Sequence, residues 1–402
     1  MSNLHMPAEM LDHIVDFLHG SEDALRSCCL VSKSWIPRTR KHLFASVEFR
    51  TAADLRSWKI MFPDPSISPA WHTKTLHVGC PQAVTTADAE KGGWLLAFPR
   101  VEHLEVDLHM VCHEAEISLI PFYGLSPALK SLRVTASYLP LQIFDLIYSF
   151  PPLDDLSVII HDMFDYDSFL EEQAVVQPSS PPSFTGSLQL FVRTGLNPIA
   201  SPLLSLPNGL NFRKLDFVGY SETDFSLATA LAERCRDTLE SIHCHPTGKL
   251  ARYSCSRRWL TRFAGEEISD LIDLSRATKL TEVAFGCDLN PEWIVMTLRT
   301  VTRSHQNLQQ ISITTSYVAH DPNLNNRNIP SMSLLVESAH VEWLRLDGLL
   351  VRLWESHSIR PKIVYLVPKR IDGKRARSCV ENLLPEATKK GIVDFTEKGH
   401  GW

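Results

Sequence analysis

The sequence predicts an α/β protein that begins with three short helices and continues as a repeating domain, with parallel strands inside and helices outside. Three observations predict this fold. Apolar residues recur with helical spacing within residues 7–44. A strand-like apolar pattern then recurs about every 28 residues between 73 and 349. Helical stretches separate several of its copies, and a helix between two strands is typical of parallel pairing.

The first helix is expected to begin at Pro7, a residue that suits the first turn. Met10 and Phe17 lie beside its main apolar stripe and widen it. Gly20 is expected to end this helix, and Ser21 to cap the next one. The stripe has spacing i, i+3, i+4 and i+7 and consists of Leu11, Ile14, Val15 and Leu18.

The second helix carries Leu25, Cys28 and Cys29 on its apolar face, and a third segment spans residues 32–44. These segments are apolar on more than one side, in a unit smaller than most that fold alone. Part of their surface is therefore expected to meet a partner. We interpret the two adjacent cysteines as small apolar residues of this packing. A redox pair is the poorer alternative, because neighbouring cysteines cannot easily bridge.

Residues 6–44, MPAEMLDHIVDFL…ALRSCCLVSKSWIPRTRKHLF, resemble an F-box, with Met6 in place of the usual first leucine. The resemblance implies an F-box domain over residues 1–50 that binds the Skp adaptor of a Skp–cullin–F-box ubiquitin ligase. An unrelated helical hairpin is the alternative. Carried over position by position, the implied adaptor-facing residues are Met6, Pro7, Ile14, Leu18, Leu25, Val31 and Trp35.

The repeated pattern places apolar residues at its first, fourth and sixth positions, as a short strand with an inward face requires. Its period is typical of leucine-rich repeats. Because the usual asparagine after the strand is largely missing, we expect an irregular leucine-rich-repeat-like solenoid. A non-repetitive α/β domain with coincidental leucine spacing is the alternative. The ten copies are centred on Leu76, Leu104, Leu132, Leu156, Leu188, Leu215, Ile242, Val283, Ile311 and Leu344.

Proline-rich segments suggest where the domains begin and end. Residues 51–72 are expected to link the F-box to the solenoid, which spans 73–349. Residues 350–402 are interpreted as a C-terminal cap, with a helix expected from about Lys374 to Lys390. The stretch ARSCVENLLPEATKKGIVDF in this cap resembles the ending of many fungal F-box proteins.

The composition argues against several partner classes. A formal net charge of -6 disfavours a general nucleic-acid surface, and no apolar run is long enough for a membrane span. The N-terminus lacks the features of a signal peptide. Nine scattered cysteines without Cys-x-x-Cys spacing favour reduced thiols and a cytoplasmic or nuclear location. Residues 368–377 are a weak candidate for a nuclear import signal.

No motif of an enzyme, cofactor site or metal site is convincing. A hydrolase hidden in the α/β part would need a nucleophile–base pair, and no motif supports one. His109, Cys112 and His113 lack an evident fourth metal ligand. Residues 165–167 (Asp-Tyr-Asp) are better explained as a solvated turn. We therefore expect no catalysis, cofactor or metal in this chain.

The polar residues between the apolar ones on each strand are expected to line a concave binding face. Their mixed charge suits a protein ligand. We predict a substrate-binding set of His243, His245, Trp343 and Arg345, with binding that changes between about pH 6 and 7.5 where histidine titrates. The expected function is substrate recognition for the ubiquitin ligase; a scaffold that binds the adaptor without directing degradation is the alternative.

Overall fold

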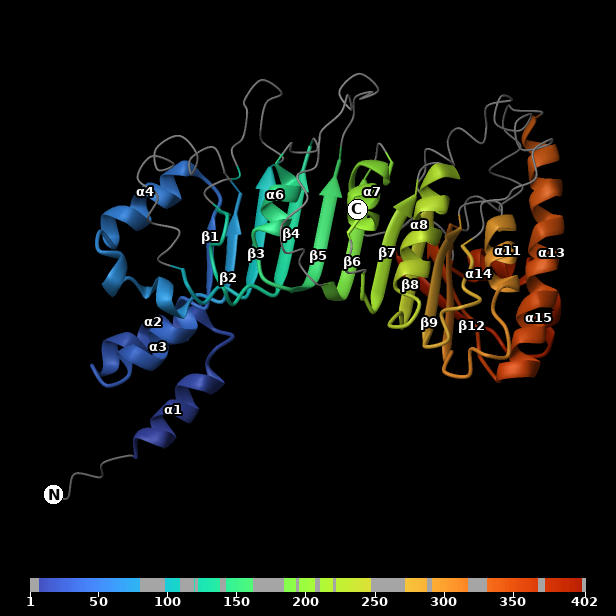
Figure 1. The fold of residues 1–402 in the computed structure, drawn as a ribbon. Coiled ribbons are helices and arrows are strands. Elements are labelled where there is room, and N and C mark those ends of the chain that lie inside the picture. The colour runs from blue at the N-terminus through green and yellow to red at the C-terminus, as the bar shows by residue number, and fades with distance from the viewer. Residues whose placement is uncertain are drawn as a thin grey trace. The chain divides into compact units, whose positions relative to one another are not determined.

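The computed structural model describes most of the chain, which divides into two compact units. Unit 1 contains the described residues up to 161, and unit 2 contains those from 184 onward. Figure 1 shows the order of their helices and strands. The described residues are 7–79, 98–108, 119, 122–137, 142–161, 184–192, 195–206, 210–219, 222–246, 272–287, 291–316, 331–367 and 373–399.

Unit 1 begins with the three short helices that the sequence predicts: α1 (Ala8–Phe17), α2 (Glu22–Val31) and α3 (Ile36–Leu43). The Ser21 side chain caps α2 by accepting from the Ala24 amide at 3.4 Å. Pro37 lies in the first turn of α3, where its missing N–H leaves no hydrogen bond unmade. Helix α3 packs against both α1 and α2.

Residues 51–72, expected to be a linker, instead contain a helix and two short 3₁₀ turns. These are α4 (Ala52–Met61), η1 (Pro65–Ile67) and η2 (Pro69–His72). Thr51 and Asp54 form a reciprocal capping box at the start of α4. Trp58 of α4 contacts an aromatic cluster of Phe44, Phe49, Phe62 and Phe98. The aromatic residues therefore pack this segment onto the strands that flank it.

The sheet of unit 1 has five strands in chain order, and each described pairing is parallel. A short helix, α6 (Ile143–Tyr148), lies between the last two strands in the chain. The strands are β1 (Ser46–Phe49), β2 (Thr75–Val78), β3 (His103–Leu108), β4 (Ser131–Ala136) and β5 (Leu153–Ile160).

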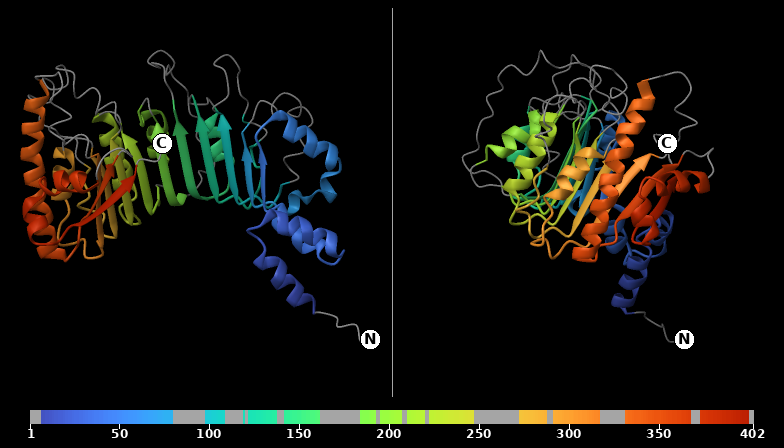
Figure 2. Two further views of the ribbon diagram at one scale, coloured as in Figure 1. Left: turned by 180° about the vertical axis from the view of Figure 1, so that it is seen from behind. Right: turned by 90° about the vertical axis from the view of Figure 1, so that its right-hand side faces the viewer.

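The described residues of unit 2 form seven further strands, again parallel and in chain order. They are β6 (Phe184–Val192), β7 (Lys214–Gly219), β8 (Ser241–Pro246), β9 (Glu282–Cys287), β10 (Gln310–Ser316), β11 (Lys362–Val367) and β12 (Asp394–Gly399). The helices described in this unit are α7 (Asn197–Leu204), α8 (Glu222–Arg234), α11 (Glu292–Arg299), α13 (Ser331–His357), α14 (Gly373–Glu381) and α15 (Pro385–Lys389). Helices α7 and α8 lie side by side on one face of the strands (Figures 1 and 2).

Nine of the ten predicted repeat centres, Leu76 to Ile311, lie on strands β2 to β10 and are at most 1% exposed. Their register follows the repeat, because Leu104 pairs with Leu76 and Leu132, and Ile242 pairs with Leu215 and Val283. The predicted α/β class and the parallel strands are therefore confirmed.

The tenth centre, Leu344, was wrongly predicted to lie on a strand. It lies in the long helix α13 and is 44% exposed. The six-residue pattern is also compatible with a helix, and the buried residues around it recur with helical spacing. They include Glu342, Trp343, Leu346, Asp347, Leu350 and Leu353.

The C-terminal segment also differs from the expected cap. Its proposed start at residue 350 falls inside α13, and β11 and β12 continue the parallel strand order. The single helix expected over 374–390 is two helices, α14 and α15. Pro385 begins the second one, since a proline in the interior would have broken a continuous helix.

Candidate functional site

Helix α1 has two apolar faces rather than the single wide stripe expected. Leu11, Val15 and Leu18 form the inner face, on which Val15 is only 1% exposed. The outer face carries Met10, Ile14 and Phe17, spaced i, i+4 and i+7, which are 54%, 38% and 87% exposed. A helix needs only one face for its own core, so the outer face is available to a partner.

The end of α2 adds to this exposed apolar surface. Leu30 and Val31 are 89% and 67% exposed, whereas Leu25 and Cys28 on the same helix are buried. The Cys28 side chain therefore packs as the sequence analysis proposed, and Cys29 is half-buried. We call Met10, Ile14, Phe17, Leu30 and Val31 the outer apolar surface.

The seven residues implied to face the adaptor fall into different environments. Pro7, Ile14 and Val31 are exposed, and Leu18 and Trp35 are half-buried. Leu25 is 2% exposed, so it supports the helices from inside and its assignment to a partner-facing position is corrected. Met6 lies outside the described residues. Met10, Phe17 and Leu30 are exposed too but were not predicted to belong to this set, because helical spacing alone does not show which side of a helix is exposed.

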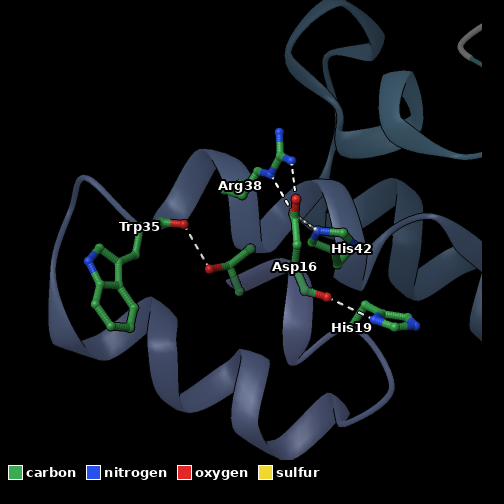
Figure 3. Close-up of polar contacts among 6 residues, drawn as sticks. Asp16, His19, Trp35, Arg38 and His42 are labelled. Carbon is green, nitrogen blue, oxygen red and sulfur yellow. Dashed lines mark hydrogen bonds and ion pairs between the residues drawn. The ribbon is translucent and has the colours of Figure 1, made fainter. Parts of the chain in front are cut away.

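A polar cluster joins α1 to α3 (Figure 3). The Asp16 carboxylate accepts two hydrogen bonds from the Arg38 guanidinium, one of them from Nε at 2.6 Å. It also accepts from His42 Nε2 at 2.7 Å. The hydrogen bonds from Arg38, and then that from His42, hold the pKa of Asp16 well below its usual range.

Two further contacts complete this cluster. His19 Nδ1 lies 2.8 Å from the Asp16 carbonyl oxygen just beyond α1. Thr39, which is fully buried, donates its hydroxyl to the Trp35 carbonyl at 2.7 Å at the start of α3. The contacts of Asp16 with Arg38 and His42 thus join α1 to α3, while the other two are local. No short motif in the sequence pairs Asp16 with residues 22 and 26 positions away, and the sequence analysis missed the cluster.

The predicted substrate residues His243 and His245 both lie on β8, on the half-exposed face of the strand. His243 Nε2 lies 3.1 Å from the Ser241 hydroxyl and 3.5 Å from Glu282 Oε1. Burial lowers the pKa of His245, an effect that the Asp216 carboxylate opposes. Binding was expected to change between about pH 6 and 7.5. Because the pKa of His245 is lowered, the part of this change that is due to His245 is expected at lower pH.

The other two predicted substrate residues, Trp343 and Arg345, are not on a strand. Trp343 is fully buried within α13 and cannot present its ring to a ligand in this state. Arg345 is exposed on the same helix and donates to Glu342 Oε1 at 2.6 Å. The prediction that Trp343 and Arg345 lie on a strand face is therefore wrong, and burial removes Trp343 from the predicted set of ligand contacts.

The strand face of unit 1 carries its own polar rows. Glu48 and His77 are register partners on β1 and β2, and His77 Nδ1 lies 3.0 Å from Glu48 Oε1. At the start of the next strands, Glu102 accepts from Lys74 and Lys130 at 2.8 and 3.0 Å. Hydrogen bonds from these two lysines lower the pKa of Glu102 to about 2. The mixed charge of these rows suits a polar protein ligand.

The two candidate chemical sites at 109–113 and 165–167 lie outside the described residues, as do residues 368–372 of the basic segment. Within the described ranges, no group of three or more His, Cys, Asp or Glu side chains could hold a metal ion. Cys235 and Cys244 are buried, and burial raises the pKa of the Cys235 thiol to about 12, which suits packing rather than reactivity.

Comparison with protein-family models and with curated proteins finds no significant match to the chain. Among the helices that the structure describes, none has the length and apolar character needed to cross a bilayer.

Proposed function

We propose that this chain is the substrate-recognition subunit of a Skp–cullin–F-box ubiquitin ligase. In this proposal α1 to α3 form an F-box that binds the Skp adaptor and, through it, a cullin. The parallel strands and their helices form a leucine-rich-repeat-like solenoid that holds a protein substrate. Such a chain catalyses nothing itself and acts by bringing the substrate close to the ligase. It would work in the cytoplasm, the nucleus or both.

The observation that carries the proposal is the outer apolar surface on α1 and α2. Its residues are exposed although the helices already have a buried side in Val15, Leu25 and Cys28. Large apolar side chains held on ordered helices are typical anchors of a protein interface. The resemblance of residues 6–44 to an F-box identifies the Skp adaptor as the partner that would cover them.

The substrate would bind where polar side chains emerge from the strands. In unit 2 these include Gln189, Asp216 and His243, which are register neighbours on β6, β7 and β8. Gln189 donates to Asp216 Oδ2 at 3.2 Å, while Asp216 Oδ1 is buried with no hydrogen-bond partner in the part of the chain that the structure describes. These neighbouring strands thus offer both donors and acceptors, which suits the mixed polar groups of a protein ligand.

Co-purification of the full chain with a recombinant Skp adaptor tests the proposal. The double variant Phe17→Ser and Leu30→Ser should bind at least about thirtyfold more weakly, since the loss of even one anchor of roughly 2 kcal/mol weakens an interface by about that factor. Both side chains are more than four-fifths exposed, so the fold should be unaffected. Ile67→Ser is the matched control, because Ile67 is 76% exposed in the same unit but outside α1 to α3.

Equal adaptor binding by the wild type and the folded double variant would contradict the F-box assignment. If the adaptor binds, a ligase reconstituted with the cullin and a captured substrate separates the two alternatives. Ubiquitin transfer to the substrate supports the recognition role, and its absence supports a scaffold without degradative function.

A further inference from the structure

A hollow with an apolar floor and a basic rim lies in unit 2, between α11 with its following turn and the C-terminal half of α13. Its volume is about 490 Å³. The floor is built from buried side chains, namely Leu298, Val301, Leu349 and Leu353. The rim carries Arg299, Arg303, Arg352 and His357, and none of the described residues that line the hollow is acidic.

The walls of the hollow are held in place by hydrogen bonds. His357 Nε2 lies 3.1 Å from the Thr302 carbonyl oxygen and so joins the end of α13 to the turn after α11. The Ser356 hydroxyl lies 2.7 Å from the other ring nitrogen of His357. The two walls are therefore fixed relative to each other without a ligand, which lowers the entropic cost of binding one.

The rim arginines differ in how far they are already neutralised. Arg299 interacts electrostatically with Glu342, whose pKa is raised mainly by burial. Within the described ranges, neither Arg303 nor Arg352 forms an ion pair; Arg352 Nε makes a long contact, 3.4 Å, to the Gly348 carbonyl. Two exposed guanidinium groups beside an apolar floor are thus free to meet carboxylates from outside.

We propose that this hollow binds an acidic peptide segment of a partner protein, with one apolar side chain on the floor and flanking carboxylates on Arg303 and Arg352. The proposal rests on the proposed function in one respect, because the segment would belong to the substrate. Charge complementarity favours an acidic peptide as the ligand. The chain as a whole has a formal net charge of -6, so the basic rim is a local exception that would attract negative charge.

The floor argues against a polyanion as the occupant. A nucleic acid would need a broad basic surface, whereas the four basic residues here surround the buried leucines and valine of a hollow. Removing a side chain of leucine size from water on such a floor favours binding. A peptide with an apolar residue next to acidic ones can pack on the apolar floor and pair with the basic rim.

The test uses the purified full chain and a short fluorescent peptide with one leucine flanked by glutamates, with binding followed by anisotropy. Arg303→Glu and Arg352→Glu should each weaken binding about tenfold, and raised salt should weaken it further. Arg213→Glu is the matched control, because Arg213 is an exposed arginine of unit 2 outside the hollow, and its binding should stay within about twofold. Replacing the peptide leucine by serine should also weaken binding about tenfold.

The proposal would be overturned if the glutamate peptide did not bind at low salt, or if a peptide with glutamines in place of the glutamates bound equally well. Binding by both rim variants as tight as that of the wild type, or binding of a phosphorylated peptide alone, would overturn it as well. Adaptor co-purification with the Arg303→Glu variant should match the wild type. Peptide binding is measured without the adaptor, so a failure of the hollow and a failure of the F-box assignment are distinguishable.

Discussion

The Glu102 carboxylate accepts a hydrogen bond from the Lys74 ammonium at 2.8 Å, although the two residues are 28 positions apart in the chain. Lys130, a further 28 positions along, contacts the other carboxylate oxygen. The backbone repeats the same relation, since the Lys74 carbonyl accepts from the amides of Glu102 and His103. Equivalent positions of successive repeats therefore lie side by side and share both backbone and side-chain bonds.

This ladder predicts an acid-sensitive contribution to stability. The folded pKa of Glu102, about 2, lies below its unfolded value of about 4.3, so the contribution is fully present above about pH 4.3 and is lost as the pH falls toward 2. Glu102→Gln should lower the free energy of unfolding at pH 7 by about 1 kcal/mol, because the lysines are largely exposed. Urea unfolding from pH 7 to pH 2 should show the difference disappearing with acidification.

Glu240→Gln is the control for this measurement. Its backbone carbonyl accepts hydrogen bonds from the amides of Thr281 and Glu282, just as the carbonyl of Glu102 accepts from those of Lys130 and Ser131. In the described part of the chain, however, the Glu240 side chain forms no ion pair. A loss of stability in Glu240→Gln equal to that in Glu102→Gln would show that the lysine contacts contribute nothing.

Two leucines of the same sequence pattern should respond differently to truncation. Leu215 is 1% exposed on β7, and Leu215→Ala should cost about 2–5 kcal/mol because its neighbours cannot close over the cavity. Leu344 is 44% exposed on α13, so Leu344→Ala should change stability by less than about 0.5 kcal/mol. Chemical denaturation of both variants measures this, and similar losses at the two positions would be evidence against the helix.

The contrast shows what the sequence could predict. The central residue of each strand repeat was predictable because a buried strand requires an apolar residue there and each repeat supplies the neighbour of the next. The VEWLRL window fits a strand and a helix equally well over six residues, and only the longer spacing through Leu350 and Leu353 distinguishes the two. The error placed Trp343 on a binding surface, whereas its side chain is fully buried.

The candidate surface on α1 was partly predictable for the same reason. Spacing identified every apolar residue of the helix but not which of its two faces meets α3. That choice depends on contacts distant in the chain, above all Asp16 with Arg38 and His42. Polar pairs between helices leave no periodic signal in a single sequence, whereas apolar stripes do.

The Asp16 cluster predicts a local loosening of α1. Asp16→Asn removes the charge that Arg38 and His42 contact, so amides of α1 should exchange faster with solvent while those of β7 do not change. Because the folded pKa of Asp16 lies below its unfolded value, its contribution is present above about pH 3.9 and is lost as the pH falls below that value. Hydrogen exchange by mass spectrometry at neutral pH measures the effect.

Glu22→Gln is the control, because the Arg26–Glu22 pair on α2 is exposed and joins no two helices. It should leave exchange in α1 unchanged. If Asp16→Asn also leaves α1 unchanged, the apolar inner face alone orients this helix, and the outer apolar surface does not depend on the polar cluster.

The last prediction concerns Asp347, a buried carboxylate on α13 that caps a different helix. Its two oxygens accept from the backbone amides of Glu386 and Ala387, at 2.8 and 2.9 Å, at the start of α15. Asp347→Ala leaves both amides without an acceptor, one of them in a buried position, and should cost about 1–3 kcal/mol. Asp347→Asn keeps one acceptor oxygen and should lose less, while Asp237→Ala, at a side chain that is 90% exposed, should be nearly neutral. Thermal unfolding of the three variants gives the order. A loss in Asp347→Asn as large as that in Asp347→Ala would show that the negative charge, rather than the acceptor oxygens, holds α15 against α13.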